Sequence, residues 1–423
     1  MSSKEVAVIG TGYVGLTTGV GLASLGHNVV CADIDPEKVD MLTRGEMPIY
    51  EEGLEELLGK ALDDGSIRFV LGAEKAVPDA EFVFMCLPTP QDDDGSANLR
   101  YVYAAASEIA PHLESDSIVI NKSTVPVGTA KATTELIGRD DVAVVSNPEF
   151  LREGSAVRDF FSPARIVIGA PALEIGERVA ELYGSMDAPI QVTSPESAEL
   201  IKYAANAFLA TKLSFANSIA VLADKVGADA LSVLHGLGTD ERVGPYFLSP
   251  GPGWGGSCFP KDTRALLHIA ETNGYHFEMV NAAIAANRDQ LFHVTNMIAN
   301  AVGGRLFDKN IGVLGLAFKK GTDDVRDSPA EAIIRRLIDG GAHVRVYDPV
   351  AQSDEFDMTD DPYEVAADAD AVVVLTEWDE FGELDLDLLR SRMKGDGLVD
   401  GRYIIDPDAA RTAGFHYRAI GRY

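Results

Sequence analysis

Cysteine is scarce in this sequence, and long apolar runs are missing. The 423 residues include three cysteines, Cys31, Cys86 and Cys258, an odd number that offers no disulfide framework and fits a reducing compartment. No apolar run reaches the roughly 18 residues that a membrane-spanning helix needs. The early apolar stretch Val6–Ile9 leads into a glycine loop and not into a cleavage site. The sequence therefore predicts a soluble, cytoplasmic protein without a membrane partner.

Positive charge is also in short supply. The chain has 36 Lys and Arg against 66 Asp and Glu, a net charge of −30. A field of this sign repels nucleic acid and anionic membrane surfaces, so we expect no nucleic-acid partner. The excess is spread along the chain, which favours a salt-adapted protein whose self-repulsion is screened at high ionic strength. A well-solvated acidic surface is the simpler alternative.

The first part of the chain alternates short β-branched runs with helical patterns, which is typical of a parallel, doubly wound sheet. A chain of this length also exceeds the roughly 250–300 residues at which one core stops growing, so more than one domain is expected. Buried strands are predicted at Val6–Ile9, Asn28–Ala32, Ala80–Leu87, Ser117–Asn121 and Val142–Ser146.

The pattern changes after residue 193. The stretch Ser194–Gly227 has Pro195 at a first-turn position and no further Pro or Gly before its end, so one long helix is predicted. A glycine- and proline-rich loop, Gly244–Pro260, precedes a helical stretch at about Thr263–Ala301.

A second strand, helix and strand follow at Ile311–Leu316, Pro329–Asp339 and Val344–Asp348, and they echo the opening unit. We therefore predict an α/β protein with two Rossmann-like, doubly wound parallel-sheet domains joined by a long central helix and a helical linker. The predicted domains are 1–193, 194–302 and 303–423.

The glycine loop after the first strand has the spacing of a dinucleotide site. Gly10, Gly12 and Gly15 would allow a tight turn, close approach of a pyrophosphate and close helix packing. Asp33 ends the next strand, where a carboxylate accepts from a ribose 2′-hydroxyl and repels a 2′-phosphate, so NAD is preferred to NADP. The second unit lacks the third glycine, but its first loop carries Lys319, Lys320 and Arg326, either as phosphate ligands or as exposed charges.

Cys258 is the candidate nucleophile, because it lies in a glycine-rich loop with Lys261 and Asp262 close by. A structural loop cysteine is the alternative, whereas Cys31 and Cys86 lie in apolar strands as core residues. Two further pairs, each four residues apart, share a helix face or a strand end: Lys202 with Asn206, and Glu149 with Glu153. The first pair can bind an oxyanion, or it can be an ordinary helix surface.

These motifs together resemble the UDP-glucose/GDP-mannose dehydrogenase family over essentially the whole chain. The matching segments are GTGYVG, CLPTP, KSTVPVGT, NPEFLREGSA, ELIKYAANAF, GPGWGGSCFPKD and GLAFKKGTDDVRDSP. The resemblance implies an NAD-binding first domain, a central helix at a dimer interface and a C-terminal domain that binds a nucleoside diphosphate.

The resemblance also implies roles for individual residues. Cys258 is similar to the nucleophile that forms a thioester, Lys202 and Asn206 to an oxyanion clamp, and Asp262 to an acid or base that acts on water. Thr124 and Glu153 resemble groups that orient water near the nicotinamide. Implied cofactor contacts are Gly10, Gly12, Tyr13, Val14, Gly15, Asp33, Lys38, Thr89, Thr124, Glu153 and Arg326. Implied substrate contacts are Glu149, Phe150, Leu151, Arg152, Glu153, Lys202, Asn206, Arg242, Phe247, Leu248, Ser249, Pro250, Gly251, Gly255 and Lys319; no metal is implied.

The choice of sugar rests on the same resemblance. Ser257 before Cys258, with Phe259 after it, differs from the branch that acts on N-acetylated sugars, and the stretch 375–381 resembles the UDP-glucose branch more than the GDP-mannose branch. We therefore expect four-electron oxidation of UDP-glucose by NAD in a homodimer or larger homo-oligomer. The alternatives are GDP-mannose or another nucleotide sugar, a two-electron hydroxyacid dehydrogenase, and a non-catalytic nucleotide-sugar sensor.

Overall fold

The computed structural model describes residues 3–422, which form two compact units. The first comprises residues up to Ala205 together with Arg264–Tyr275, and the second comprises Asn206–Thr263 together with the residues from His276 onward. Helices α8 (Pro195–Val226) and α10 (Phe259–Thr272) each begin in one unit and end in the other. Among the described residues, no helix is long and apolar enough to cross a bilayer.

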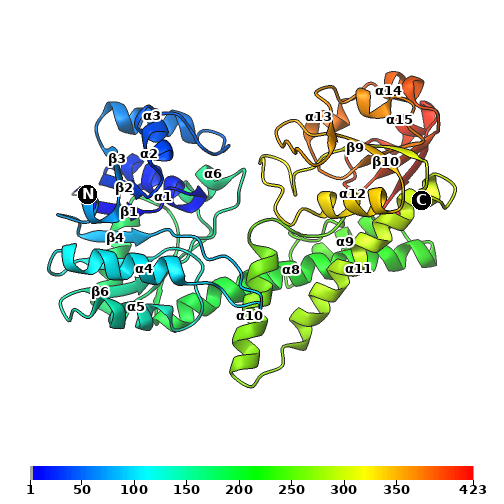
Figure 1. The fold of residues 1–423 in the computed structure, drawn as a ribbon. Coiled ribbons are helices and arrows are strands. Elements are labelled where there is room, and N and C mark those ends of the chain that lie inside the picture. The colour runs from blue at the N-terminus through cyan, green and yellow to red at the C-terminus, as the bar shows by residue number, and fades with distance from the viewer. Residues whose placement is uncertain (1–2, 423) are drawn as a thin grey trace. The chain divides into compact units, whose positions relative to one another are not determined.

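An eight-stranded sheet forms the centre of the first unit (Figure 1). Its strand order is β3-β2-β1-β4-β5-β6-β7-β8, and the paired strands are parallel except for β6 and β7. This is the doubly wound sheet that the sequence predicts, and all five predicted strands are present. The bounds are β1 Glu5–Ile9, β2 Asn28–Asp33, β3 Ile67–Leu71, β4 Phe82–Met85, β5 Ile118–Asn121, β6 Ala143–Ser146, β7 Ile166–Gly169 and β8 Ile190–Thr193.

Helices cover both faces of this sheet because alternate strand residues are apolar on both sides (Figure 1). Val6 and Val8 of β1 join a core with Leu16 of α1, whereas Ala7 and Ile9 join a second core with α4 and α5. The helices are α1 Tyr13–Ser24, α2 Pro36–Thr43, α3 Leu54–Asp63, α4 Arg100–Ile109, α5 Thr129–Ile137, α6 Ala156–Phe161 and α7 Leu173–Ala180, with short 3₁₀ turns at Ala73–Lys75, Ala110–His112 and Glu181–Tyr183.

The second unit is built on a six-stranded parallel sheet of order β11-β10-β9-β12-β13-β14. Ile311 and Val313 of β9 pack with α11 and α12, and Leu314 packs on the opposite face. The strands are β9 Asn310–Leu314, β10 His343–Tyr347, β11 Asp357–Met358, β12 Ala371–Val374, β13 Gly397–Asp400 and β14 His416–Ala419. The helices are α9 Ala230–Gly238, α11 Glu278–Ala301, α12 Pro329–Asp339, α13 Asp379–Gly382, α14 Leu386–Arg392 and α15 Pro407–Thr412, with a 3₁₀ turn at Glu364–Ala366.

The helical part of the chain differs in one respect from the sequence prediction. The long helix is confirmed as α8, but the stretch predicted at 263–301 is two helices, α10 and α11, separated at Gly274, which has a φ of +73°. Helix α10 also begins earlier, at Phe259, because Pro260 is tolerated in a first turn, where its missing N–H is not needed. Cys258 therefore lies directly before a helix and not inside a long loop.

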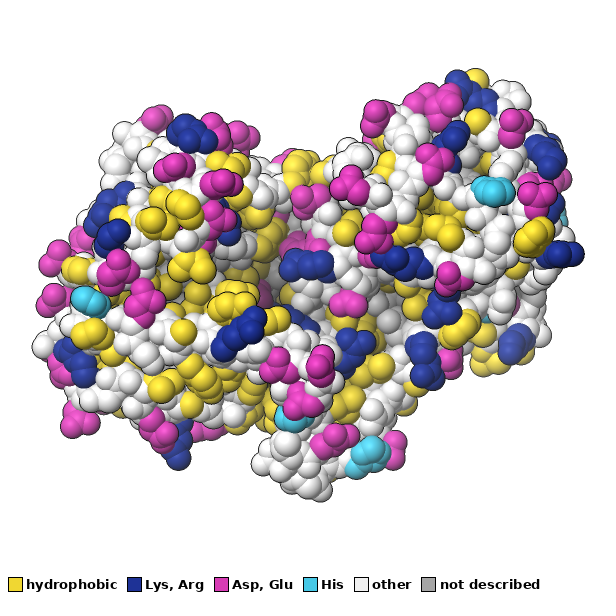
Figure 2. All heavy atoms as spheres, viewed as in Figure 1, with side chains coloured by type: hydrophobic (Ala, Val, Ile, Leu, Met, Phe, Trp, Pro, Cys, Tyr) yellow, Lys and Arg dark blue, Asp and Glu magenta, His cyan; other side chains and the backbone are white. Residues whose placement is uncertain are grey.

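The acidic residues are distributed over both units. Figure 2 shows Asp and Glu side chains interspersed with fewer Lys and Arg on the face in view. Several of the exposed cations are already paired, for example Arg335 with Glu331 and Glu355. The net negative charge is thus spread along the chain and not confined to one segment.

Candidate active site

The glycine loop between β1 and α1 has the geometry of a dinucleotide-binding turn. Gly10 has a φ of +93°, and a Cβ there would lie 2.5 Å from the Cys86 carbonyl oxygen. A Cβ at Gly15 would lie 1.8 Å from the Gly10 oxygen, so only glycine lets α1 start this close to the strand. Nothing lies within 4 Å of a Cβ at Gly12. That open backbone at a helix N-terminus fits the pyrophosphate of a dinucleotide.

Asp33 is held at the end of β2 by the same loop. Its Oδ2 accepts from the Thr11 backbone N–H at 2.9 Å and from the Thr11 hydroxyl at 2.6 Å, and the Lys38 ammonium lies 3.6 Å away. Burial raises the pKa of Asp33, but the Thr11 hydrogen bonds and Lys38 outweigh it and hold the pKa below its usual value. The carboxylate is therefore ionised at neutral pH, as recognition of a ribose hydroxyl requires.

The next two strand ends carry the predicted threonines. The Thr89 hydroxyl, after β4, donates to the Thr124 carbonyl, after β5, at 3.0 Å, and both side chains are buried. The turn that follows Thr124 is anchored by Glu199 of α8, which accepts from Gly128 N at 2.7 Å and Ala130 N at 2.9 Å. The first unit thus places the predicted cofactor residues at the carboxyl edge of one sheet. Arg326 lies in the second unit, where it pairs with Asp324 at 2.8 Å.

Lys202 and Glu149 form a buried ion pair in the first unit. The Lys202 Nζ donates to Glu149 Oε1 at 2.8 Å, and Glu149 Oε2 accepts from the Leu151 backbone N–H at 2.5 Å. The centre of the Phe150 ring lies 5.3 Å from the Lys202 ammonium and 3.7 Å from the Arg165 guanidinium. A buried lysine is therefore oriented by the loop that follows β6.

A second buried lysine, Lys122, lies close to this pair and was not singled out by the sequence. Its Nζ donates to Asn147 Oδ1 at 3.0 Å and lies 3.4 Å from the Tyr183 hydroxyl. Burial lowers the pKa of Lys122 to about 8, with the nearby Lys202 acting in the same direction and Cys86 and Glu149 opposing it. Lys122 begins the KSTVPVGT segment, but its buried setting could not be predicted, because its partners Asn147 and Tyr183 are distant in the sequence.

In the second unit, Cys258 lies at the N-terminus of α10. Its carbonyl accepts from the Asp262 N–H at 2.9 Å, and its Sγ lies 3.5 Å from the Ser257 hydroxyl. Helix N-termini stabilise negative charge, which favours the thiolate form of the predicted nucleophile. Cys31 and Cys86 differ, since both are fully buried and burial raises the pKa of Cys86 to about 12.

Asp262 contacts two other predicted catalytic residues, Asn206 through its side chain and Cys258 through its backbone. Its side chain, 1% exposed, accepts from Asn206 Nδ2 at 2.6 Å and from the Lys261 ammonium at 2.6 Å. Asn206 projects from α8, and Asp262 belongs to the first turn of α10, four residues after Cys258. The second unit therefore brings a thiol, a carboxylate and an amide donor to the start of one helix.

The glycine loop before Cys258 is held by side chains that sequence reasoning did not find. Asn217 of α8 accepts from Gly251 N at 2.8 Å, Gln290 of α11 donates to the Gly251 carbonyl at 2.8 Å, and Asn287 bonds both backbone groups of Trp254. Buried amides on otherwise apolar helix faces are the signal that could have revealed them.

Two glycines in this loop admit no side chain. A Cβ at Gly255 would lie 1.9 Å from the Asp327 carbonyl oxygen, and one at Gly256, with a φ of +79°, would lie 2.7 Å from the Phe318 ring. The loop is thus packed against the first loop of the C-terminal sheet. The Phe318 ring in turn has the Lys319 ammonium 5.3 Å from its centre, which places this predicted ligand beside the loop.

Most of the remaining predicted substrate residues lie in the segment after α9. Arg242 is 88% exposed in its side chain and pairs with Asp240. Phe247 has a φ of +61°, and its ring lies 6.4 Å from that of Phe259. Leu248 and Pro250 are buried, and Ser249 is exposed between them. In the first unit, Arg152 pairs with Asp159 at 2.6 Å.

The strand-end aspartate of the C-terminal sheet is more enclosed than Asp33. Asp348 Oδ2 accepts from Leu316 N at 2.8 Å, from Ala317 N at 3.0 Å and from the Trp378 indole at 3.1 Å. Its side chain is buried, and its other oxygen accepts from two backbone N–H groups of its own turn. Both sheets therefore have an aspartate at the end of their second strand, but Asp348 is more deeply buried than Asp33.

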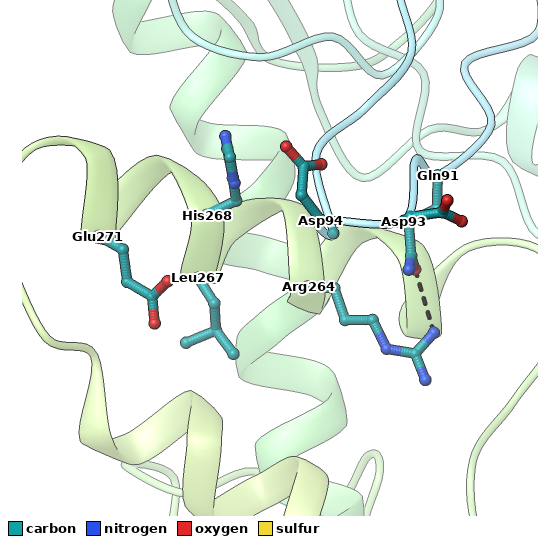
Figure 3. Close-up of a pocket in the computed structure, with 8 residues that line it drawn as sticks. Gln91, Asp93, Asp94, Arg264, Leu267, His268 and Glu271 are labelled. Carbon is teal, nitrogen blue, oxygen red and sulfur yellow. Dashed lines mark hydrogen bonds between the residues drawn. The ribbon is translucent and has the colours of Figure 1, made fainter.

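An open crevice of about 340 Å³ lies in the first unit between the loop after β4 and α10 (Figure 3). Arg264 donates to Gln91 across it at 3.0 Å, while Asp94, His268 and Glu271 project around it (Figure 3). None of the residues predicted for the site lines this crevice, which is completed by Asp93, Gly95 and Leu267.

A Rossmann sheet with an intact glycine loop and an ionised strand-end Asp33, followed by a second parallel sheet, is typical of a dinucleotide-dependent dehydrogenase. Three family models match the chain: the UDP-glucose/GDP-mannose dehydrogenase NAD binding domain at residues 4–187, the central domain at 196–289 and the UDP binding domain at 312–407. The chain belongs to the UDP-glucose/GDP-mannose dehydrogenase family. It is an NAD-dependent nucleotide-sugar dehydrogenase.

Full-length relatives agree with this assignment. A UDP-glucose 6-dehydrogenase of Rhizobium meliloti is 45% identical over 99% of both chains. One of Bacillus subtilis is 43% identical over 99% of this chain and 93% of its own. The structure of a UDP-glucose dehydrogenase from the hyperthermophilic archaeon Pyrobaculum islandicum has a TM-score of 0.92 at 40% identity, covering 100% of this chain and 98% of that one.

Proposed function

We propose that this chain oxidises the C6 alcohol of UDP-glucose to a carboxylate. The observation that carries the proposal is the relatedness to UDP-glucose 6-dehydrogenases, which are 43–45% identical over essentially the full chain. The residues that such a reaction needs are present: a thiol at a helix N-terminus, a buried carboxylate, and amide and ammonium donors. A two-electron hydroxyacid dehydrogenase would need neither Cys258 nor a UDP-binding domain.

The first unit supplies the groups that would hold NAD. The open backbone at Gly12 would hold the pyrophosphate, and Asp33 would accept from a ribose hydroxyl. Tyr13, Val14, Lys38 and Thr89 are proposed as the other contacts. When bound, NAD supplies the acceptor for the hydride that leaves C6. Thr124 and Glu153 orient water on this side of the reaction.

Cys258 acts as the nucleophile in the proposed mechanism. Its thiolate adds to the C6 aldehyde, a C–S bond forms, and the carbonyl oxygen becomes an oxyanion. Asn206 donates one amide hydrogen to Asp262 and has a second for the oxyanion, while Lys202, which donates to Glu149, contributes its positive charge. Loss of a second hydride turns the thiohemiacetal into a thioester.

Hydrolysis of the thioester completes the reaction. Asp262 or Glu153 takes a proton from water, the water oxygen attacks the carbonyl carbon, and the C–S bond breaks to release the thiolate. The hydrogen bonds that fix both oxygens of Asp262, four residues after Cys258, support this role. One uronate and two NADH leave per sugar.

Substrate recognition is proposed for two sets of residues. Glu149–Glu153, with Lys202, belong to the first unit, and Arg242, Phe247–Gly251, Gly255 and Lys319 belong to the second. In terms of domains, 1–193 would bind NAD, 194–302 would carry the catalytic loop and the dimer contact, and 303–423 would bind UDP. Arg326 is proposed as a further cofactor contact.

A homodimer is proposed from the surface of α8. Phe208, Phe215 and Leu222 are 62%, 50% and 53% exposed, and their spacing of seven residues places them in one stripe along the helix. A symmetric copy of the same stripe would cover this apolar surface, because a twofold axis brings identical faces together. Light scattering should give twice the chain mass, and Phe215→Glu should give the monomer; a wild-type monomer at working concentration would remove the proposal.

The function is tested by incubating the purified protein with NAD and each of several nucleotide sugars while NADH absorbance is followed. UDP-glucose should give steady turnover and two NADH per sugar, whereas GDP-mannose and UDP-N-acetylglucosamine should give little. Faster turnover with GDP-mannose would move the assignment to that branch. Binding of UDP-glucose and NAD without any NADH would indicate a sensor.

A further inference from the structure

Glu51 lies in the loop between α2 and α3, and its carboxylate is buried among groups from two other segments, the glycine loop and residues 154–156. One oxygen accepts from the Tyr13 hydroxyl in a very short hydrogen bond and from the Gly154 N–H at 2.7 Å. The other accepts from the Ala156 N–H at 2.6 Å. Only 6% of the residue is exposed. A buried carboxylate in this position costs free energy unless its partners are fixed, so these contacts constrain both loops.

The two loops that meet at Glu51 are those of the proposed cofactor site. Tyr13 is the first residue of α1, inside the glycine loop, and Gly154 directly follows Glu153. The Gly154 N–H is shared between the Tyr13 hydroxyl, at 2.8 Å, and Glu51. Gly154 also has a φ of +74°, so the turn after Glu153 has a conformation that a side chain at position 154 would strain.

The protonation state of Tyr13 is consistent with a permanent link. Burial, and then the hydrogen bond to Glu51, raise the pKa of Tyr13 far above its usual value. The hydroxyl therefore stays a donor to the carboxylate over the working pH range. A neutral acceptor in place of Glu51 would weaken this charge-assisted hydrogen bond and lose one of the two acceptor oxygens.

We propose that Glu51 is a positioning residue that locks the Glu153–Gly154 turn onto Tyr13 of the glycine loop. NAD binding and the orientation of Glu153 are then coupled through one carboxylate. The inference deepens the proposed function, in which Glu153 works beside the nicotinamide. Glu51 touches neither substrate nor reacting atoms in this proposal.

Glu51→Gln tests the proposal, because glutamine keeps the length and offers one acceptor oxygen. The dissociation constant of NAD, measured by titration without sugar, should rise about tenfold, as expected for loss of one or two hydrogen bonds to a charged group. With UDP-glucose, kcat should fall by a similar factor, and the KM for UDP-glucose should stay within about twofold. Glu52→Gln, at the neighbouring exposed position, should change none of these.

A double-mutant cycle separates positioning from stability. Tyr13→Phe removes only the hydroxyl, so its effect on NAD binding should not add to that of Glu51→Gln, because both break the same link. If Glu51→Gln lowers the melting temperature but leaves the NAD dissociation constant and kcat at wild-type values, Glu51 is only a structural cap and the proposal fails. Failure of the proposed function, seen as no NADH from UDP-glucose, leaves the NAD titration as a decisive measurement of the link.

Discussion

The Asn206 amide donates to the Asp262 carboxylate at 2.6 Å, which joins α8 to the first turn of α10 next to Cys258. Replacing Asn206 by Ala removes this donor and, in the proposed mechanism, one ligand of the oxyanion. We expect kcat for UDP-glucose to fall by about 10²-fold, the usual effect of losing one such donor. Asn300→Ala, at an exposed position of α11, is the matched control. A fall of less than about threefold would remove Asn206 from the oxyanion site.

Cys258→Ser should abolish acid formation. A hydroxyl is far too basic to ionise near neutrality without a strong base, whereas a thiol at a helix N-terminus is readily ionised. Wild type should give two NADH per UDP-glucose, and the variant at most a burst below one equivalent, with any trapped sugar visible as added mass on the peptide that contains residue 258. Cys31→Ala should keep the wild-type stoichiometry in the folded fraction. Steady turnover of Cys258→Ser at a near wild-type rate would exclude a covalent route.

The ionised Asp33 predicts cofactor preference. A 2′-phosphate placed against this carboxylate is repelled, so the dissociation constant of NADP should exceed that of NAD by at least about tenfold. Asp33→Ser should narrow the difference, mainly by weakening NAD, and Asp40→Asn on the exposed side of α2 should not. Equal affinities of the wild type for the two dinucleotides would contradict this assignment.

Lys122 predicts a pH dependence of stability. Its pKa in the folded state, about 8, lies below the value of about 10.5 in an unfolded chain, so between these pH values the unfolded state binds more protons. This group therefore makes the protein more stable as pH rises from 8 towards 10.5, by at most about 3 kcal/mol. The titratable groups that face Lys122 are Cys86, Tyr183, Glu149 and Lys202. All four are unchanged in the variant Lys122→Met. The free energy of unfolding, measured with denaturant at several pH values, should rise less steeply with pH in this variant than in the wild type. Identical pH dependences would show that Lys122 does not titrate as described.

The net charge of −30 predicts dependence on salt. At low ionic strength the carboxylates repel one another over about 10 Å or more, whereas about 1 M salt shortens this range to about 3 Å. Melting temperature and activity should therefore rise steeply with KCl. Sucrose at equal osmolality is the control for a general solute effect. Full thermal stability in dilute buffer would show that the charge is simply well solvated.

Local pattern was sufficient for much of the fold. The apolar runs around β1, β2 and β5, and the glycine spacing at Gly10 and Gly15, depend on neighbouring residues only, so the sequence predicted them. The start of α10 was missed because Pro260 reads as a loop residue until its place in a first turn is known. The antiparallel pairing of β6 with β7 was not predicted, since strand direction depends on the path of a connection.

The site divides in the same way. Cys258, Asp262 and Lys202 could be predicted as site residues because their residue types and spacing point to chemistry, and their roles stay predictions. Glu51 and Lys122 could not, because each depends on partners more than twenty residues away that only the folded chain brings together. The burial of Glu51 and Lys122 depends on tertiary contacts, so it could not be predicted from composition or periodicity.

The buried contacts of Asp348 show that the second sheet does not offer the same cofactor-binding edge as the first. The Trp378 indole and the loop amides already occupy this carboxylate, whereas Asp33 keeps part of its surface in solvent. Restoring glycines to the loop after β9 would therefore not create a second dinucleotide pocket. The second sheet repeats the scaffold of the first, but its strand-end aspartate braces the domain internally. Redesign of this domain for another nucleotide has to begin at Trp378.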